Sequence, residues 1–239
     1  MDLLNQLPAS VMSILILCLV IGVKYLINMN HQLTTSGIFA LYCQQMALKV
    51  NKDSHSIGHR KVAGAIATLI TFAPLVIILW LFEAFVAVPW LWDGLLLFVA
   101  LGPLNLKRVA AKEAHLLARQ DKYQAKQHLA PYVLRETDQL SVMGLAKTTI
   151  EMMLLRSFQQ QFTIAFYFLF VGPLAAISIR LLLEMHYQWN VKQRRFNAFG
   201  GFVSALVDLI QWLPGRLYLV GFTLITLNQS VFLYWRLTK

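Results

Sequence analysis

One stretch decides the fold: Ser204-Ala205-Leu206-Val207-Asp208-Leu209-Ile210-Gln211-Trp212-Leu213-Pro214-Gly215-Arg216-Leu217. Its apolar residues recur at the spacing of one helix face, and it runs directly into the apolar segment 217–235. We predict a helix here that is closed by Pro214 and Arg216. The two charged residues, Asp208 and Arg216, then lie at a membrane boundary. Because an unpaired charge at membrane depth is costly, both are candidate site residues.

The composition extends this interpretation to the whole chain. The 239 residues are 58% hydrophobic and 13% charged, whereas soluble domains are about 25% charged. Five apolar runs approach or exceed the roughly 20 residues that cross a bilayer: 11–27, 62–88, 88–106, 162–183 and 217–235. We predict an all-α integral membrane protein of about four to five transmembrane or re-entrant helices with amphipathic interfacial helices. We expect a single polytopic domain over residues 1–239.

The charge pattern favours a membrane over nucleic acid. The net charge is +10, and basic loops beside membrane spans are typical of cytoplasmic segments. No stacking or groove-reading motif accompanies the charge, so we expect no nucleic-acid partner. The two cysteines, Cys18 and Cys43, have no disulfide-framework or metal-site spacing.

Two polar segments interrupt the apolar runs. In the first, helical spacing over 37–50 predicts an interfacial helix. The second, a polar helical loop at 107–161, predicts one helix from about 106 to 127 and another capped by Ser141. We expect this loop to pack on the membrane domain, because it has few apolar residues for a core of its own.

The run 162–183 contains Gly172-Pro173. A single kinked spanning helix is favoured over two half-helices that open toward a cavity. The charges of the loops leave the orientation and the number of full spans open.

Seven dispersed polar residues could line one pocket at the membrane surface. Arginine and lysine bind phosphate or carboxylate groups, and two acids could hold Mg²⁺. The alternative is a set of surface ion pairs, and the residues alone do not decide between the two. The seven are Arg135, Thr137, Glu151, Lys192, Arg195, Asp208 and Arg216.

Four motifs carry a resemblance to a known family: Arg135-Glu136-Thr137, Ile150-Glu151, the stretch from Lys192 to Gly200, and Pro214-Gly215-Arg216-Leu217. With them the sequence resembles the CbiB/CobD membrane proteins of cobalamin biosynthesis, the adenosylcobinamide-phosphate synthases, in a superfamily that also holds AmpE-type membrane regulators. His31 corresponds to an early His-Pro-Val of that family.

The resemblance implies a multi-pass protein of the bacterial cytoplasmic (inner) membrane. It implies a ligase that joins a corrinoid carboxylate to an aminopropanol phosphate with ATP and Mg²⁺. By the same resemblance Glu151 and Asp208 are the catalytic and metal-binding residues. The substrate-binding residues are then His31, Arg135, Thr137, Lys192, Arg195 and Arg216.

The sequence departs from the family pattern at its acids. Leu155–Gln160 replaces a Glu-Asn-Thr-x-Asp-Gly cluster, Val207 replaces the first aspartate of a pair, and Gln211 replaces an asparagine. Removing such groups from an active site typically costs orders of magnitude in rate. Three functions stay open: a working synthase, a non-catalytic AmpE-like regulator or ligand sensor, and a scaffold. Protein partners and oligomeric state stay open as well.

Overall fold

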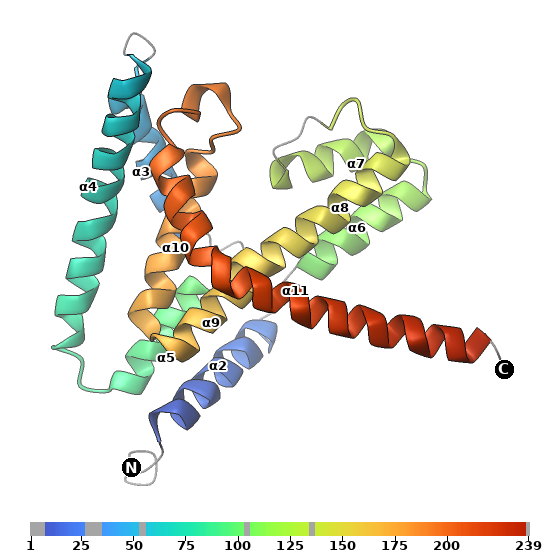
Figure 1. Ribbon diagram of the computed structural model, residues 1–239, viewed down its shortest axis with the longest axis horizontal. Coiled ribbons are helices and arrows are strands. Elements are labelled where there is room, and N and C mark those ends of the chain that lie inside the picture. The colour runs from blue at the N-terminus through green and yellow to red at the C-terminus, as the bar shows by residue number, and fades with distance from the viewer. Residues whose placement is uncertain (1–7, 27–34, 53–55, 103–105, 134–136, 238–239) are drawn as a thin grey trace.

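The computed structural model describes residues 8–26, 35–52, 56–102, 106–133 and 137–237 (Figure 1). Every regular element in these ranges is a helix. The prediction of an all-α fold is therefore confirmed for the part of the chain that the structure describes.

The first four helices contain most of the apolar runs 11–27, 62–88 and 88–106 and the polar segment 37–50. They are α2 (Ala9–Leu26), α3 (Thr35–Val50), α4 (Ile57–Glu83) and α5 (Pro89–Ala100). Ser56 caps α4, because its hydroxyl accepts a hydrogen bond from the His59 backbone N–H. Proline stands at the first position of α5, where no backbone N–H is needed.

The polar segment folds as three helices instead of two. They are α6 (Leu106–Ala118), α7 (Lys122–Leu129) and α8 (Val142–Ser157), with a short 3₁₀ turn at Ala130–Tyr132. The prediction of one helix to about 127 is wrong, because Gln120 adopts a φ of 59° and Asp121 caps a new helix. Ser141 caps α8 as predicted, with its Oγ 3.1 Å from the Gly144 nitrogen.

A long helical rod follows. The rod consists of α8, the π-helix η2 (Phe158–Phe162) and α9 (Thr163–Phe170). Gly172 then turns the chain with a φ of 122°, and Pro173 starts α10 (Pro173–Gln188), which packs against α9. The prediction of one kinked helix over 162–183 is wrong, because only glycine readily adopts this φ and proline restarts the helix.

The last helix is continuous. After the 3₁₀ turn η3 (Arg194–Phe196), α11 runs from Gly201 to Leu237 with Pro214 inside it, and its second half leaves the bundle (Figure 1). The prediction that Pro214 closes the helix is wrong, since proline removes one backbone hydrogen bond without ending this helix. Arg216 is exposed on it.

Two groups of buried apolar residues hold the chain together. The larger lies in the bundle, which we define as α2, α3, α4, α5, α9, α10 and the first half of α11. At its centre Trp189 is fully buried, donates to the Cys43 carbonyl at 3.0 Å and meets the Phe199 ring edge-on. The smaller lies in the small unit, α6 to α8, around Leu129 and Leu145. The predicted polar loop thus has a core of its own, and the single domain over 1–239 stays a prediction.

One helix has the length and composition of a membrane span. Within the described ranges, only the 27-residue α4 meets both requirements. The run 88–106 forms the 12-residue α5, which is too short to cross alone.

Candidate functional site

Helix α10 presents one polar stripe in an otherwise apolar bundle. The stripe consists of Arg180, Glu184, Tyr187 and Gln188, which recur at helical spacing on one side of α10. Each of these side chains contacts a group from the same helix or from a different part of the chain. Along α10 the stripe has three parts: a deep end at Arg180 and Glu184, a middle at Tyr187 and an outer end at Gln188.

At the deep end, a buried ion pair lies on α10. Arg180 Nη2 is 2.5 Å from Glu184 Oε1, and the two side chains are only 13% and 10% exposed. Arg180 Nη1 is buried without a hydrogen-bond partner among the described residues. Lys24 of α2 donates to the Leu101 carbonyl at the end of α5, where a helix terminus favours a cation.

In the middle, three side chains form a hydrogen-bond chain. The Tyr187 hydroxyl donates to Gln159 Oε1 at 2.7 Å, and Gln159 Nε2 donates to Gln211 Oε1 at 3.3 Å. Burial raises the pKa of the Tyr187 hydroxyl, which lies beyond the predicted span 162–183. Gln159 and Gln211 stand where the resembling family has an aspartate and an asparagine. The structure thus brings two distant motif positions together as a neutral pair.

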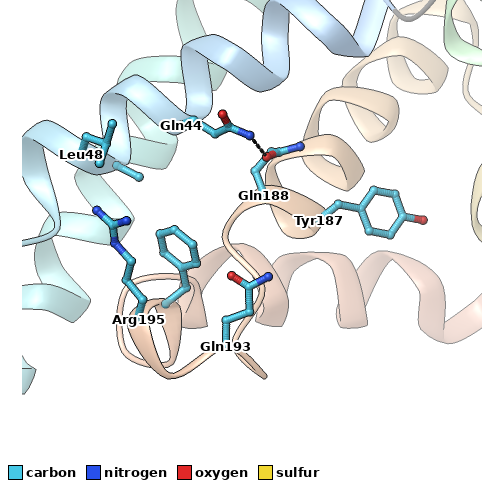
Figure 2. Close-up of a pocket in the computed structure, with 8 residues that line it drawn as sticks. Gln44, Leu48, Tyr187, Gln188, Gln193 and Arg195 are labelled. Carbon is cyan, nitrogen blue, oxygen red and sulfur yellow. Dashed lines mark hydrogen bonds between the residues drawn. The ribbon is translucent and has the colours of Figure 1, made fainter. Parts of the chain in front are cut away.

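At the outer end lies a cavity of about 320 Å³ between α3, α10 and the turn before α11. Gln44 Nε2 donates to Gln188 Oε1 at 3.0 Å across it. Figure 2 shows Arg195 rising from the turn toward Leu48, while the Tyr187 ring points away. The lining residues are Gln44, Ala47, Leu48, Tyr187, Gln188, Gln193, Arg195 and Phe196.

The hairpin between α3 and α4 holds this turn in place. The Arg195 carbonyl accepts a hydrogen bond from Asn51 Nδ2 at 2.8 Å and another from the Arg60 guanidinium. Arg60 Nε also donates to Asn51 Oδ1 at 2.8 Å. Because its backbone is fixed from two sides, Arg195 presents its guanidinium at a defined place in the cavity wall.

Two predicted site residues act on a histidine that the sequence analysis missed. Burial lowers the pKa of His186, the charge of Asp208 opposes this shift, and the charge of Lys192 adds to it. His186 Nδ1 is buried without a partner within the described ranges. Burial thus favours the neutral form of the ring, and the charges of Asp208 on α11 and Lys192 in the turn act on it in opposite senses.

The remaining predicted residues lie elsewhere. Glu151 is half exposed and lies 4.0 Å from Lys147, one turn away on α8. Thr137 is buried and donates to the Lys126 carbonyl. Arg216 contacts the Trp212 ring, with 4.9 Å between its guanidinium and the ring centre. Arg135 and His31 lie outside the described residues.

The described residues offer few side-chain ligands for Mg²⁺. Among the described residues no three His, Cys, Asp or Glu side chains come together, and no hydrogen bond or ion pair joins Glu151 to Asp208. A magnesium site would need ligand phosphate oxygens beside either carboxylate. The joint metal site of Glu151 and Asp208 stays a prediction.

The sequence carried one signal for the residues that it missed. Arg180 and Glu184 stand one helical turn apart at the end of an apolar run, and such charges usually face a polar interior. Gln44, Gln159 and Gln188 carried no such signal, because uncharged amides are unremarkable in a helix.

Comparison with known proteins places the chain. Residues 15–239 match the family described as CobD/Cbib protein. The chain belongs to the CobD/CbiB family.

Two curated relatives are named Cobalamin biosynthesis protein CobD. The one from Stutzerimonas stutzeri (strain A1501) is 29% identical over 173 residues, which cover 72% of this chain and 57% of the relative. The one from Chromobacterium violaceum is 25% identical over 206 residues, which cover 86% of this chain and 66% of the relative. The chain thus spans less than two thirds of either relative's length. No solved structure matches this member of the family.

Proposed function

We propose that the chain is a membrane-embedded member of cobalamin biosynthesis that binds a corrinoid carrying a free carboxylate. Family membership over residues 15–239 supports this proposal, and so do two relatives named for cobalamin biosynthesis. The whole activity of those longer relatives is part of the proposal, because the chain spans only part of them.

The cavity beside Arg195 is the observation that carries the proposal. Of the predicted substrate-binding residues that the structure describes, Arg195 alone lines it, beside Gln44, Gln188 and Gln193. A guanidinium binds a carboxylate through two parallel hydrogen bonds. The primary amides can donate to and accept from the amide groups around a corrin ring. We therefore place the corrinoid carboxylate at Arg195.

The membrane placement rests on α4 and on composition. Over 27 residues α4 is apolar and mostly exposed, which costs less in lipid than in water. We propose a multi-pass protein of the bacterial cytoplasmic membrane whose lipid-facing surface includes α4. The other four predicted apolar runs supply the remaining crossing or re-entrant segments.

A second candidate function stands beside catalysis. A synthase would join the bound carboxylate to an aminopropanol phosphate with ATP and Mg²⁺, with Glu151 and Asp208 near the phosphates. The neutral pair Gln159–Gln211 favours the second candidate, a ligand-sensing AmpE-like protein that binds without turnover. Amides are poorer ligands for Mg²⁺ than the carboxylates that the family carries in this region.

Binding of cobyric acid to the purified protein in detergent tests the proposal. We expect Arg195→Ala to weaken binding roughly tenfold or more, because a hydrogen-bonded charge is lost. Arg194→Ala is the matched control, since Arg194 is exposed and does not line the cavity. Equal binding by both variants and the unaltered chain, or no binding at all, contradicts the proposal.

Adding Mg·ATP and aminopropanol phosphate to the same sample separates the two candidates. A gain in corrinoid mass that depends on ATP identifies a synthase. Binding without a mass change identifies the ligand sensor.

A further inference from the structure

A second hollow lies against a different face of α3 from the cavity beside Arg195. It has a volume of about 220 Å³ and is lined by one face of α4 and the last turn of α3. Its lining is apolar except at one end, where His59 stands. The lining residues are Met46, Val50, His59, Val62, Ala63, Ile66, Ala67 and Ile70.

The shape of this groove suits an extended chain. The lining positions on α4 run from His59 to Ile70, a rise of about 16 Å along the helix. A helix about 10 Å across needs far more room than 220 Å³. A single alkyl chain therefore matches the groove better than a helix of another protein.

Basic residues gather at the His59 end. Lys49 lies in the last turn of α3 and Lys52 follows that helix; both are exposed. Arg60 is fixed beside them by its bonds to Asn51 and to the Arg195 carbonyl. Within the described parts of 35–82 there is no acidic side chain.

We propose that this groove binds one acyl chain of an anionic phospholipid, with the lipid phosphate between Lys49 and Lys52. The inference rests on the membrane placement proposed above, since α4 is then in contact with lipid. An apolar slot that ends in lysines complements a molecule with a long hydrocarbon chain and one negative end. Juxtamembrane lysines attract anionic lipids, each with a modest energy that falls off with distance.

Native mass spectrometry of the full chain in detergent tests the site. The probes are dioleoylphosphatidylglycerol, dioleoylphosphatidylcholine with the same acyl chains, and glycerol 1-phosphate without chains. We expect the anionic lipid to be retained at roughly tenfold lower concentration than the neutral lipid. We expect glycerol 1-phosphate not to be retained by the protein, because the acyl chain supplies part of the binding free energy.

Two variants separate the headgroup from the chain. Lys49→Gln with Lys52→Gln should remove the preference for the anionic lipid, while Lys112→Gln with Lys122→Gln, two exposed lysines of the small unit, should leave it. Ala63→Phe should fill the groove and weaken retention of both lipids. Leu69→Phe is its control, because Leu69 is exposed on α4 outside the lining.

The outcomes are distinct from those of the proposed function. Equal retention of the two lipids, or an unchanged preference in both lysine pairs, overturns the lipid site. Retention of glycerol 1-phosphate alone identifies an anion site without an acyl chain and also overturns it. A chain that does not float with phosphatidylcholine vesicles contradicts the membrane placement itself. Cobyric acid binding is measured without added lipid, so its failure leaves the lipid result intact.

Discussion

The bundle buries charged and polar side chains and exposes apolar ones, whereas the small unit buries apolar side chains and exposes charged ones. The bundle buries Arg180, Glu184 and Gln160 while its α4 exposes large apolar side chains such as Trp80 at 61%. The small unit buries leucines around Leu129 and exposes charged side chains of α6 and α7. An apolar exterior is stable in lipid and a charged exterior is stable in water. One chain thus carries two surfaces suited to two solvents.

The small unit also buries a charged side chain, which sharpens the comparison. Glu113 is fully buried, and its Oε2 lies 2.9 Å from His128 Nδ1, while Oε1 has no partner within the described ranges. In both regions, therefore, a buried carboxylate has one basic side chain as its partner: Arg180 for Glu184 in the bundle and His128 for Glu113 in the small unit. The predictions below test whether each region depends on its own contacts.

The largest effect is expected where two backbones touch. A Cβ on Gly64 of α4 would lie 2.0 Å from the Phe199 carbonyl oxygen, so Gly64→Ala should force the start of α11 away from α4. We expect a loss of about 3 kcal/mol or more from the bundle, as overpacking against backbone costs. Hydrogen exchange should show lost protection in α4 and α11 and unchanged protection in α6 to α8. Gly58→Ala, which meets nothing within 4 Å, should be harmless; equal effects of both variants would refute the contact.

The next effect is expected at the ion pair of α10. Arg180→Ala leaves Glu184 buried without its partner and should destabilise the bundle by about 3 kcal/mol. Replacing both residues by Met should restore most of the loss, because no buried charge remains. Thermal unfolding in detergent measures both variants. A double variant no more stable than Arg180→Ala would show that the pair is needed for more than charge compensation.

A smaller effect is expected in the small unit. Glu113→Ala removes the hydrogen-bond partner of His128 and should destabilise α6 to α8 by about 2 kcal/mol. Exchange protection should fall there and persist in the bundle. Replacing Glu113 and His128 together by Leu should recover stability. If bundle amides exchange faster as well, the two regions do not unfold separately.

The smallest effect is expected at Tyr187. Tyr187→Phe removes the hydroxyl that donates to Gln159 and should cost about 1 kcal/mol. Tyr123→Phe, in the exposed part of α7, makes the same change and should cost less than about 0.5 kcal/mol. Chemical denaturation of the two variants compares them directly. A larger loss at Tyr123 would contradict the assignment of the buried hydrogen bond.

The sequence predicts the helices better than their ends. The apolar run 62–88 predicted α4, and the Ser141 hydroxyl marked the start of α8. The sequence could not predict the break at Gln120, since a left-handed glutamine has no pattern of its own. The sequence pattern also predicted a continuous helix through Gly172-Pro173, where the helix breaks, and a helix end at Pro214, where the helix continues. Both contain proline in an apolar run, and packing decides whether the chain turns or continues.

The sequence predicted only a few residues at the periphery of the candidate site. Arg195 was singled out by a motif and lines the cavity, and Lys192 and Asp208 act on one histidine. The outer half of the α10 stripe was missed because its partners are remote in sequence: Gln44 meets Gln188 across 144 residues, and Gln159 meets Tyr187 across 28. Such pairings become visible only when the helices are placed side by side.

The rod of α8, η2 and α9 has a mechanical consequence. It runs without interruption from residue 142 to residue 170, about 40 Å, and joins the small unit to the bundle. The widened π-helical turn at Phe158–Phe162 lies between the small unit and the bundle. Gln159 stands on that turn and is hydrogen-bonded to Tyr187 and Gln211. A bend of the rod at this turn would therefore change the two hydrogen bonds that Gln159 makes.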